Sequence, residues 1–409
     1  MKVAYLIVNE RPGSGLLNSQ VVGLLKELSL LCELKITLIA IWQPWIYLKY
    51  KREVQDLKCE LETFDIVLIS IPFGLPSRYI NTSSVLLSLS MKYSSALIGR
   101  YLKNFNVVHC RSYFASYIAS LHKKSNAFKL IFDMRSLLPE ESIVTGLWVK
   151  DSKIFNVWKK VEKDIVEQSD SIVVINKPML EHIQKSYGSH NYECIPIGYS
   201  ARTLKKDYLA RNSIRSRLNI NNKTVVLYSG SIAVNFWNDI NVYAKYFKYL
   251  NSINKDLFFL ILTRNPHEPL VRCLDSNGIS NYMIKNIPSN EMSEWLSAGD
   301  LGIQVMDPMA DGATRFGVKV VEYLAMGMPI ITNSNVGGVA DLVTDHDLGI
   351  VIDDFENDND FGRLISNSDY YSSRCQRFSK KSFEFNNLAR KYLDLYVDIT
   401  NITLKLKKL

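Results

Sequence analysis

The sequence predicts an α/β protein with two domains, each built on a parallel sheet. Short apolar runs alternate with amphipathic stretches along most of the chain, a pattern typical of strands joined by crossover helices. A length of 409 residues suits two domains of ordinary size. In such folds helices cover both faces of each sheet, and ligands collect at the carboxyl ends of the strands.

The first half of the chain contains a series of predicted strands, at residues 3–8, 34–41, 66–71, 107–109, 129–132 and 171–175. Helical patterns lie between them, at residues 18–31, 85–102 and 154–167. The segment ECIPIGYS (193–200) carries Pro and Gly just after a strand and leads into a polar run. We therefore place the first domain at residues 1–200.

A second alternating series follows, with strands expected at residues 224–229, 258–263, 282–284, 301–305, 330–332 and 349–352. From residue 377 onward the pattern is helical, with Phe383, Leu388, Tyr392 and Leu395 at helical spacing. These features place a second domain at residues 201–385 and a closing helix at 386–409.

The composition is that of a globular protein, with 47% hydrophobic and 22% charged residues. No apolar run approaches the roughly 18 residues that a membrane-spanning helix needs, and the N-terminus lacks the features of a signal peptide. The six cysteines are scattered without metal-site spacing, as expected for reduced thiols in the cytoplasm. We expect no metal site and no secretion.

The net charge of +8 permits binding to an anionic surface. The best local candidate is the segment 41–58, in which aromatic residues and cations interleave: Trp42, Trp45, Tyr47, Lys49, Tyr50, Lys51, Arg52 and Lys58. Such a mixture suits contact with the inner face of the cell membrane, and a partly buried aromatic cluster explains it equally well. Nucleic acid is disfavoured because no nucleic-acid-binding motif accompanies the charge.

The segment 311–338, DGATRFGVKVVEYLAMGMPIITNSNVGG, is the most informative part of the chain. It predicts a polar loop, a short helix ended by Gly327, and a buried strand that leads into a Gly-Gly loop. Arg315 and Lys319 lie at the helix start, where the helix dipole disfavours cations unless an anion shares the site. With Gly317 and the free amides of the first turn, they form a candidate phosphate site.

Glu322 follows Lys319 by three residues and projects from the same side of the helix. A carboxylate in this position could accept hydrogen bonds from ribose hydroxyls. The alternative is an amphipathic surface helix, in which the Lys319–Glu322 pair contributes only a few tenths of a kcal/mol.

The motif KVVEYLAMGMPII, preceded by FG and followed by GG, resembles the donor-site signature of family 4 GT-B glycosyltransferases, the glycosyl transferases group 1. The stretches SDSIVVINKPMLEHI (169–183), VVLYSGSI (225–232) and LSAGDLGIQVM (296–306) resemble the same family in order and spacing. The resemblance implies two Rossmann-like domains with parallel sheets facing a central cleft, and a C-terminal helix that packs back toward the first domain. It also implies retention of anomeric configuration without a metal.

The sequence departs from the family pattern at two places in the second domain. Thr314 occupies the position of the first of two signature glutamates, and YSGSIAVNFWND (228–239) lacks the usual phosphate-binding cations. Lys319, Arg315 and Arg264 are the available substitutes, in that order. The resemblance assigns Glu322 to the ribose and places Thr314, Asp311 and Gly312 near the donor sugar, while Gly230 either approaches the donor or is an ordinary turn glycine.

In the first domain the resemblance places Gly13 and Gly15 near the donor phosphate or the acceptor, and His109 near the donor sugar. Asn18 replaces the third glycine of a dinucleotide fingerprint, which disfavours NAD, and we expect no cofactor besides the nucleotide-sugar co-substrate. Asp133 and Arg135 are candidates for acceptor binding. A structural histidine and an internal ion pair with Glu140 or Glu141 are the alternatives.

These features predict a cytoplasmic glycosyltransferase of bacterial surface glycan synthesis, such as lipopolysaccharide or capsule. It would move a sugar from a nucleotide diphosphate sugar to a saccharide or a lipid-linked saccharide. The two departures from the pattern leave open an inactive paralogue that acts as a partner or binding subunit. A nucleotide-sugar epimerase of the same fold is a further alternative.

Overall fold

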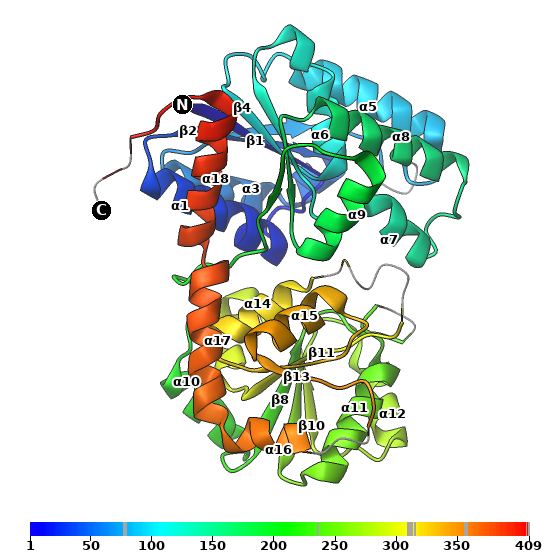
Figure 1. Ribbon diagram of the computed structural model, residues 1–409, viewed down its shortest axis with the longest axis vertical. Helices are drawn as coiled ribbons and strands as arrows, with labels where there is room; N and C mark the ends of the chain where they lie inside the picture. The colour runs from blue at the N-terminus through cyan, green and yellow to red at the C-terminus, as the bar shows by residue number, and fades with distance from the viewer. Residues whose placement is uncertain are drawn as a thin grey trace. The chain divides into compact units, whose positions relative to one another are not determined.

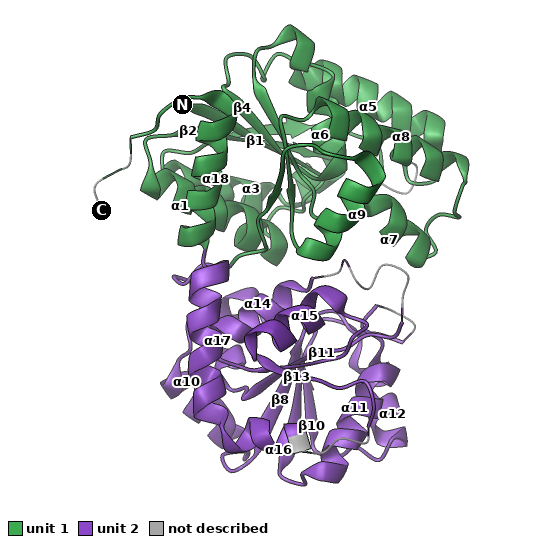
Figure 2. Ribbon diagram, in the orientation of Figure 1, with its two compact units in different colours: residues 1–198, 385–409 green, residues 199–384 purple. Residues whose placement is uncertain are grey.

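The computed structural model describes residues 1–405 and 407, apart from 77–79, 235–236, 309–313, 315 and 356–358. The chain divides into two compact units (Figure 2). Unit 1 comprises Met1–Gly198 and Phe385–Leu409, and unit 2 comprises Tyr199–Glu384. Each unit is a parallel sheet with interleaved helices (Figure 1), which confirms the predicted α/β fold class.

The sheet of unit 1 has the strand order β3-β2-β1-β4-β5-β6-β7, and every adjacent pair is parallel. Its strands are β1 (Lys2–Val8), β2 (Lys35–Trp42), β3 (Val67–Pro72), β4 (Val107–Arg111), β5 (Lys129–Asp133), β6 (Ser171–Val174) and β7 (Tyr192–Cys194). Its helices are η1 (Leu17–Val22), α1 (Gly23–Leu31), α2 (Pro44–Lys49), α3 (Lys51–Glu62), α5 (Ser84–Ile98), α6 (Ser112–Ser120), η2 (Lys123–Ser125), α7 (Leu138–Val144), α8 (Lys153–Gln168), α9 (Lys177–Tyr187) and α18 (Phe385–Thr400).

The sheet of unit 2 has the order β10-β9-β8-β11-β12-β13, again all parallel. Its strands are β8 (Thr224–Ser229), β9 (Leu257–Leu262), β10 (Tyr282–Lys285), β11 (Leu301–Gln304), β12 (Ile330–Thr332) and β13 (Gly349–Val351). Its helices are α10 (Tyr208–Arg217), α11 (Ile240–Ile253), α12 (His267–Ser276), η3 (Ser289–Glu291), α13 (Met292–Ser297), α14 (Val318–Ala325), α15 (Gly337–His346), α16 (Asn359–Ser366) and α17 (Ser368–Phe383). The Gly-Gly pair predicted as a loop forms the start of α15 instead.

Central strands read as apolar runs because helices cover both of their faces. The strand β9, LFFLIL, is buried at five of its six positions, and β8 is buried from Val225 to Ser229. Successive residues of a strand point to opposite faces of the sheet, so a strand that is covered on both faces has no position for a solvated polar side chain.

Helix α18 belongs to unit 1 although unit 2 separates it from the rest of that unit in sequence (Figure 1). It packs on α1, where a Cβ atom built on Gly23 would lie 2.7 Å from the Phe385 ring. Leu388, Tyr392 and Tyr396 bury their side chains on the same helix. The close approach at Gly23 therefore requires a residue without a side chain.

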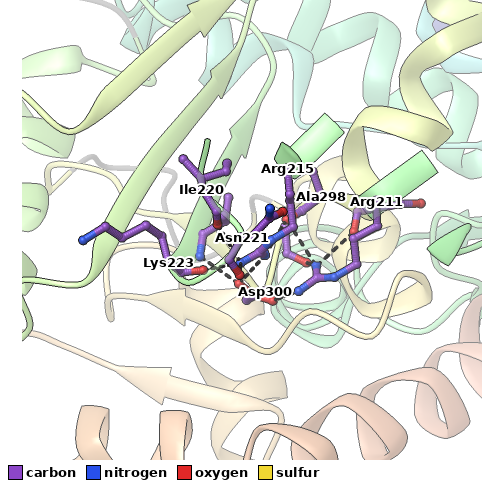
Figure 3. Close-up of polar contacts among 10 residues, drawn as sticks. Arg211, Arg215, Ile220, Asn221, Lys223, Ala298 and Asp300 are labelled. Atoms are coloured by element: carbon purple, nitrogen blue, oxygen red, sulfur yellow. Dashed lines mark hydrogen bonds and ion pairs between the residues drawn. The ribbon is translucent and has the colours of Figure 1, made fainter. Parts of the chain in front are cut away.

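A partly buried ion network holds the amino-terminal edge of the sheet in unit 2 (Figure 3). Arg215 Nη1 and Arg211 Nη2 both donate to the Asp300 carboxylate, and Asp300 Oδ2 also accepts from the Val225 amide at 2.8 Å. Burial alone would raise the pKa of Asp300, but the two guanidinium groups outweigh it and hold that pKa below its usual value. Since ligands bind at the opposite edge of a parallel sheet, this network is structural.

Candidate donor site and the two sheet edges

Helix α14 begins at Gly317, whose extended backbone and missing side chain leave the first-turn amides without a side-chain cap. Val320, Val321, Tyr323 and Leu324 bury the inner face of the helix. The other face carries Lys319 and Glu322, whose Nζ and Oε2 atoms are 3.3 Å apart. The helix ends as predicted, at Gly327 with a φ of +72°.

The carboxyl end of β8 lies directly against this helix start. Gly230 has a φ of +144°, which side chains rarely tolerate, and a Cβ atom built there would lie 3.5 Å from Lys319 Cε. The Ser229 amide donates to the Tyr323 hydroxyl at 2.7 Å, which fixes α14 to the strand end. Gly230, Gly317, Lys319 and Glu322 are therefore brought together at one place.

The same place contains two polar residues that the sequence reasoning missed. Gln304, at the end of β11, is buried, and its Nε2 donates to Asn238 Oδ1 at 2.9 Å. Its Oε1 lies 3.4 Å from a Cβ built on Gly317. The sequence contains a signal for Gln304: a single glutamine inside the buried run LGIQVM, near the carboxyl end of a strand, lies at the edge of the sheet where ligands bind.

The remaining predicted residues of unit 2 are less closely grouped. Arg264 is exposed and donates to Ser289 Oγ, beyond the end of β10, at 2.7 Å. Its neighbour Asn265 accepts from the Ile232 amide at 3.2 Å and so joins the loops after β8 and β9. Thr314 is half-buried. Asp311, Gly312 and Arg315 lie outside the described residues.

At the carboxyl edge of the sheet in unit 1, His109 and Asp133 have no exposed side-chain surface. His109 contacts the Tyr396 hydroxyl through Nδ1 at 2.7 Å and Asp133 Oδ2 through Nε2 at 3.2 Å. Arg135 donates to the same Asp133 oxygen at 2.6 Å and to the Tyr392 hydroxyl at 3.0 Å. These contacts join β4, β5 and α18 in one network, in which Asp133 Oδ1 and Arg135 Nε are buried without a hydrogen-bond partner among the described residues.

The ionisation of this network follows from its burial. Burial lowers the pKa of His109, although the Asp133 carboxylate opposes that shift, so the imidazole is neutral. Burial would raise the pKa of Asp133, but Arg135 and His109 outweigh it and hold that pKa well below its usual range. The ion pair is between Arg135 and Asp133, whereas Glu140, one of the two partners considered from the sequence, binds Lys159 at 2.9 Å.

The loop after β1 holds the two other candidates of unit 1. Gly13 has a φ of +68°, which favours glycine, and a Cβ atom there would lie 3.0 Å from Glu53 Cγ on α3. Gly15 faces open space. Glu10 in the same loop accepts from Arg111 Nε at 3.0 Å, an ion pair between the loop after β1 and the end of β4 that the sequence did not reveal.

Within the described part of the chain, no group of three or more His, Cys, Asp or Glu side chains is arranged to hold a metal ion. The search for membrane spans, over the same residues, found no helix both long and apolar enough to cross a bilayer.

Two parallel sheets with interleaved helices, and a helix N-terminus facing a strand-end glycine in the second, define a two-domain GT-B fold of the kind found in glycosyltransferases. Solved structures agree. Sucrose-phosphate synthase from Thermosynechococcus elongatus has a TM-score of 0.69 at 13% identity, over 98% of this chain and 100% of the other. Anabaena HepE in complex with UDP has a TM-score of 0.68 at 12% identity, over 97% and 100%. WaaG, a glycosyltransferase involved in lipopolysaccharide biosynthesis, has a TM-score of 0.62 at 12% identity, over 96% and 99%.

Residues 223–367 match the family model described as Glycosyl transferases group 1. Unit 2 therefore contains a group 1 glycosyltransferase domain, and the chain has the GT-B fold. No protein with a curated function matches the chain by sequence.

Proposed function

We propose that the protein transfers a sugar from a nucleotide diphosphate sugar to a hydroxyl of a saccharide or lipid-linked saccharide, in bacterial surface glycan synthesis. The group 1 domain in unit 2 supports the donor class. The similar HepE structure contains UDP, and WaaG is described as acting in lipopolysaccharide biosynthesis, which supports both the donor and the pathway.

The observation that carries the proposal is the convergence of Lys319, the uncapped start of α14 and Gly230. In the reaction the bond from the anomeric carbon to the diphosphate oxygen breaks, and the acceptor oxygen bonds to the same carbon. Negative charge then develops on the leaving nucleoside diphosphate. A cation and free backbone amides fixed beforehand stabilise that charge without reorganising. Arg315 is assigned to the same role from the sequence alone.

Glu322 is the proposed ribose ligand. Its side chain is only 17% exposed and lies one turn below the amides that would hold the diphosphate. Lys319 is 31% exposed, so both groups remain reachable from solvent. We propose that Thr314, Asp311 and Gly312 face the donor sugar and that Gly317 and Arg264 complete the donor site. Gly13 and Gly15 are candidates from the family resemblance alone. Retention of configuration and independence from metals are proposed from the family resemblance.

For the acceptor side we propose a positioning role for the network of His109, Asp133 and Arg135. Two of these side chains are fully buried, so they hold the edge of unit 1 in shape, and more exposed residues of that edge would contact the acceptor. Membrane contact through residues 41–58 is a further proposal. It is supported by the exposed Trp45 and Leu48 on α2, whereas Trp42 is buried and stacks with Tyr47.

The test is a thermal-shift screen with UDP, GDP, ADP and CMP. A ligand present at about 100 times its Kd stabilises the native state by about 2.7 kcal/mol. Lys319→Ala should weaken binding by roughly 10- to 100-fold, because a charge-assisted hydrogen bond is lost, and leave the melting temperature without ligand unchanged. Lys223→Ala is the matched control, since Lys223 lies at the opposite edge of the same sheet and pairs with Asp256.

If Lys319→Ala kept the full nucleotide-induced shift in melting temperature, the donor-site assignment would be wrong. Release of nucleoside diphosphate from the matching donor then separates an active transferase from an inactive paralogue, which would bind the nucleotide and release nothing.

A further inference from the structure

The middle of unit 1 has an unusual charge distribution. The 67 residues from 66 to 132 contain no Asp or Glu, whereas the whole chain has 41. The same stretch carries eight cations: Arg78, Lys92, Arg100, Lys103, Arg111, Lys123, Lys124 and Lys129. A surface formed from such a stretch has no carboxylates of its own to neutralise it.

Three of these cations are neutralised by other parts of unit 1: Arg111 by Glu10, and Lys123 and Lys129 by Asp170. Lys92, Arg100, Lys103 and Lys124 are exposed, and among the described residues none of the four has a carboxylate partner. His122 contacts Ser95 Oγ at 2.8 Å, which brings the Lys123–Lys124 turn to the carboxyl end of α5. The four free cations therefore gather along and just beyond this helix.

Helix α5 also exposes an apolar stripe. Val85, Leu89 and Tyr93 recur every four residues and are 67%, 42% and 62% exposed. The opposite face buries Leu87, Met91 and Ile98. A helix that packs with one face normally carries polar residues on the other, so an apolar outer face indicates a partner.

The loop after α7 extends this apolar area. Trp148 is buried and donates from Nε1 to the Asn81 carbonyl at 2.8 Å, which holds the loop beside the start of α5. Its neighbours Leu147 and Val149 are exposed, as are Lys150, Asp151 and Lys153. Apolar side chains and lysines thus continue together from the helix onto the loop.

We propose that this α5 surface, made of Val85, Leu89, Tyr93, Leu147 and Val149 with Lys92, Arg100, Lys103 and Lys124, binds an anionic lipid bilayer. Apolar side chains enter the headgroup region while long cationic side chains reach the lipid phosphates. A single-stranded nucleic acid would need several aromatic rings for stacking, and Tyr93 is the one exposed ring on α5. The inference deepens the proposed function, because lipid-linked acceptors lie in a bilayer.

The α5 surface differs from the segment 41–58. On α3 the cations alternate with Glu53, Asp56, Glu60 and Glu62, and Lys58 lies 3.8 Å from Glu62. Mixed charges of this kind attract an anionic membrane weakly. The pair Lys245 and Lys248, on α11 of unit 2, is exposed like Lys92 and Arg100 and lies outside both segments, so it provides a matched control.

The experiment measures co-sedimentation of the full chain with phosphatidylcholine vesicles, with or without phosphatidylglycerol. The protein should bind the anionic vesicles. Lys92→Gln combined with Arg100→Gln should weaken binding more than tenfold, since each cation near an anionic surface contributes roughly fivefold. Lys245→Gln with Lys248→Gln, on α11 of unit 2, should leave binding unchanged. Val85→Ser with Leu89→Ser should weaken the binding that survives at high salt, where electrostatic attraction is screened.

Three outcomes would overturn the inference: no binding to anionic vesicles, equal loss in the Lys245 and Lys248 control, or tighter retention of an RNA oligonucleotide than of vesicles. Melting temperatures of all variants check folding, which is expected to be intact because the changed side chains are exposed. Donor binding is followed separately by the UDP thermal shift. Its absence alongside normal vesicle binding would reject the proposed function and leave the lipid surface standing.

Discussion

Both sheets carry polar side chains at the carboxyl ends of their central strands, but the two edges differ in how far those groups are already satisfied. In unit 1, His109, Asp133 and Arg135 bind one another and two tyrosines of α18. In unit 2, Lys319 has Glu322 as its ion partner, and the amides at the start of α14 have no side-chain cap. The first edge satisfies most of its polar groups internally, although Asp133 Oδ1 and Arg135 Nε have no partner among the described residues. The second edge offers a cation and uncapped amides to a ligand.

The difference has a simple physical origin. Unit 1 receives an additional helix, α18, whose tyrosine hydroxyls reach the strand ends and replace water. At the corresponding edge of unit 2, Gly230 and Gly317 leave open backbone where side chains would otherwise fill the space. Polar residues at a strand end therefore indicate a ligand site only when the rest of the fold leaves them accessible.

Breaking the ion network at the carboxyl edge of the sheet in unit 1 should have the largest effect on the free energy of unfolding. Asp133→Ala removes the carboxylate that pairs with Arg135 and His109, and breaking a buried pair costs about 3–5 kcal/mol. Urea denaturation should show this loss in the transition of unit 1. Asp256→Ala, which breaks the exposed pair with Lys223, should change stability by less than about 1 kcal/mol. Equal effects would mean that the network is not the stabilising feature.

Filling the space beside Gly230, at the carboxyl edge of the sheet in unit 2, should have the next largest effect on stability and should also affect UDP binding. Gly230→Ala places a Cβ at a φ of +144° and 3.2 Å from the Tyr228 hydroxyl, which should cost about 1–3 kcal/mol. It should also abolish the UDP thermal shift, because the methyl group enters the space beside Lys319. Gly362→Ala, on α16 with nothing within 4 Å, serves as the control and should not destabilise the protein. A full UDP shift in Gly230→Ala would argue against this space as the donor site.

A smaller change tests the link between α18 and the sheet. Tyr396→Phe removes the hydroxyl that contacts His109 and should cost about 1 kcal/mol in urea denaturation. Tyr208→Phe removes an exposed hydroxyl and should be neutral. If the two variants were equally stable, the tyrosine contact would be dispensable.

The smallest effect is on pH dependence. The pKa of His109 is lowered in the folded state, so below about pH 6.5 the unfolded chain takes up a proton that the folded chain refuses. Stability should therefore fall as the pH drops from about 7 to about 5, and His109→Gln should reduce this slope in urea midpoints. The control variant His267→Gln, on α12, should have the same slope of stability against pH as the wild type. A steeper slope in His109→Gln would contradict the assignment of a neutral buried imidazole.

Much of this architecture is visible in the sequence because it depends on local patterns. Alternating apolar runs and amphipathic stretches predicted two parallel sheets, and the three-residue spacing of Lys319 and Glu322 placed their side chains together. Other contacts are invisible because they join distant parts of the chain. His109 and Tyr396 are 287 residues apart, and no local pattern pairs them. Gln304 was missed for another reason, since one polar residue in an apolar strand reads as an irregularity until the strand's neighbours are known.

The discontinuity of unit 1 has a consequence for how the protein is made. Unit 2 is a continuous segment, 199–384, and all of it has been synthesised before α18 exists. Unit 1 has its sheet early, but the tyrosines of α18 that contact its buried charges are translated only after the whole of unit 2. Domains generally fold as units while the ribosome is still at work. Here unit 1 begins to be synthesised first but can complete its fold only after unit 2 has been made. Until residues 385–400 emerge, water must solvate the charges of Asp133 and Arg135.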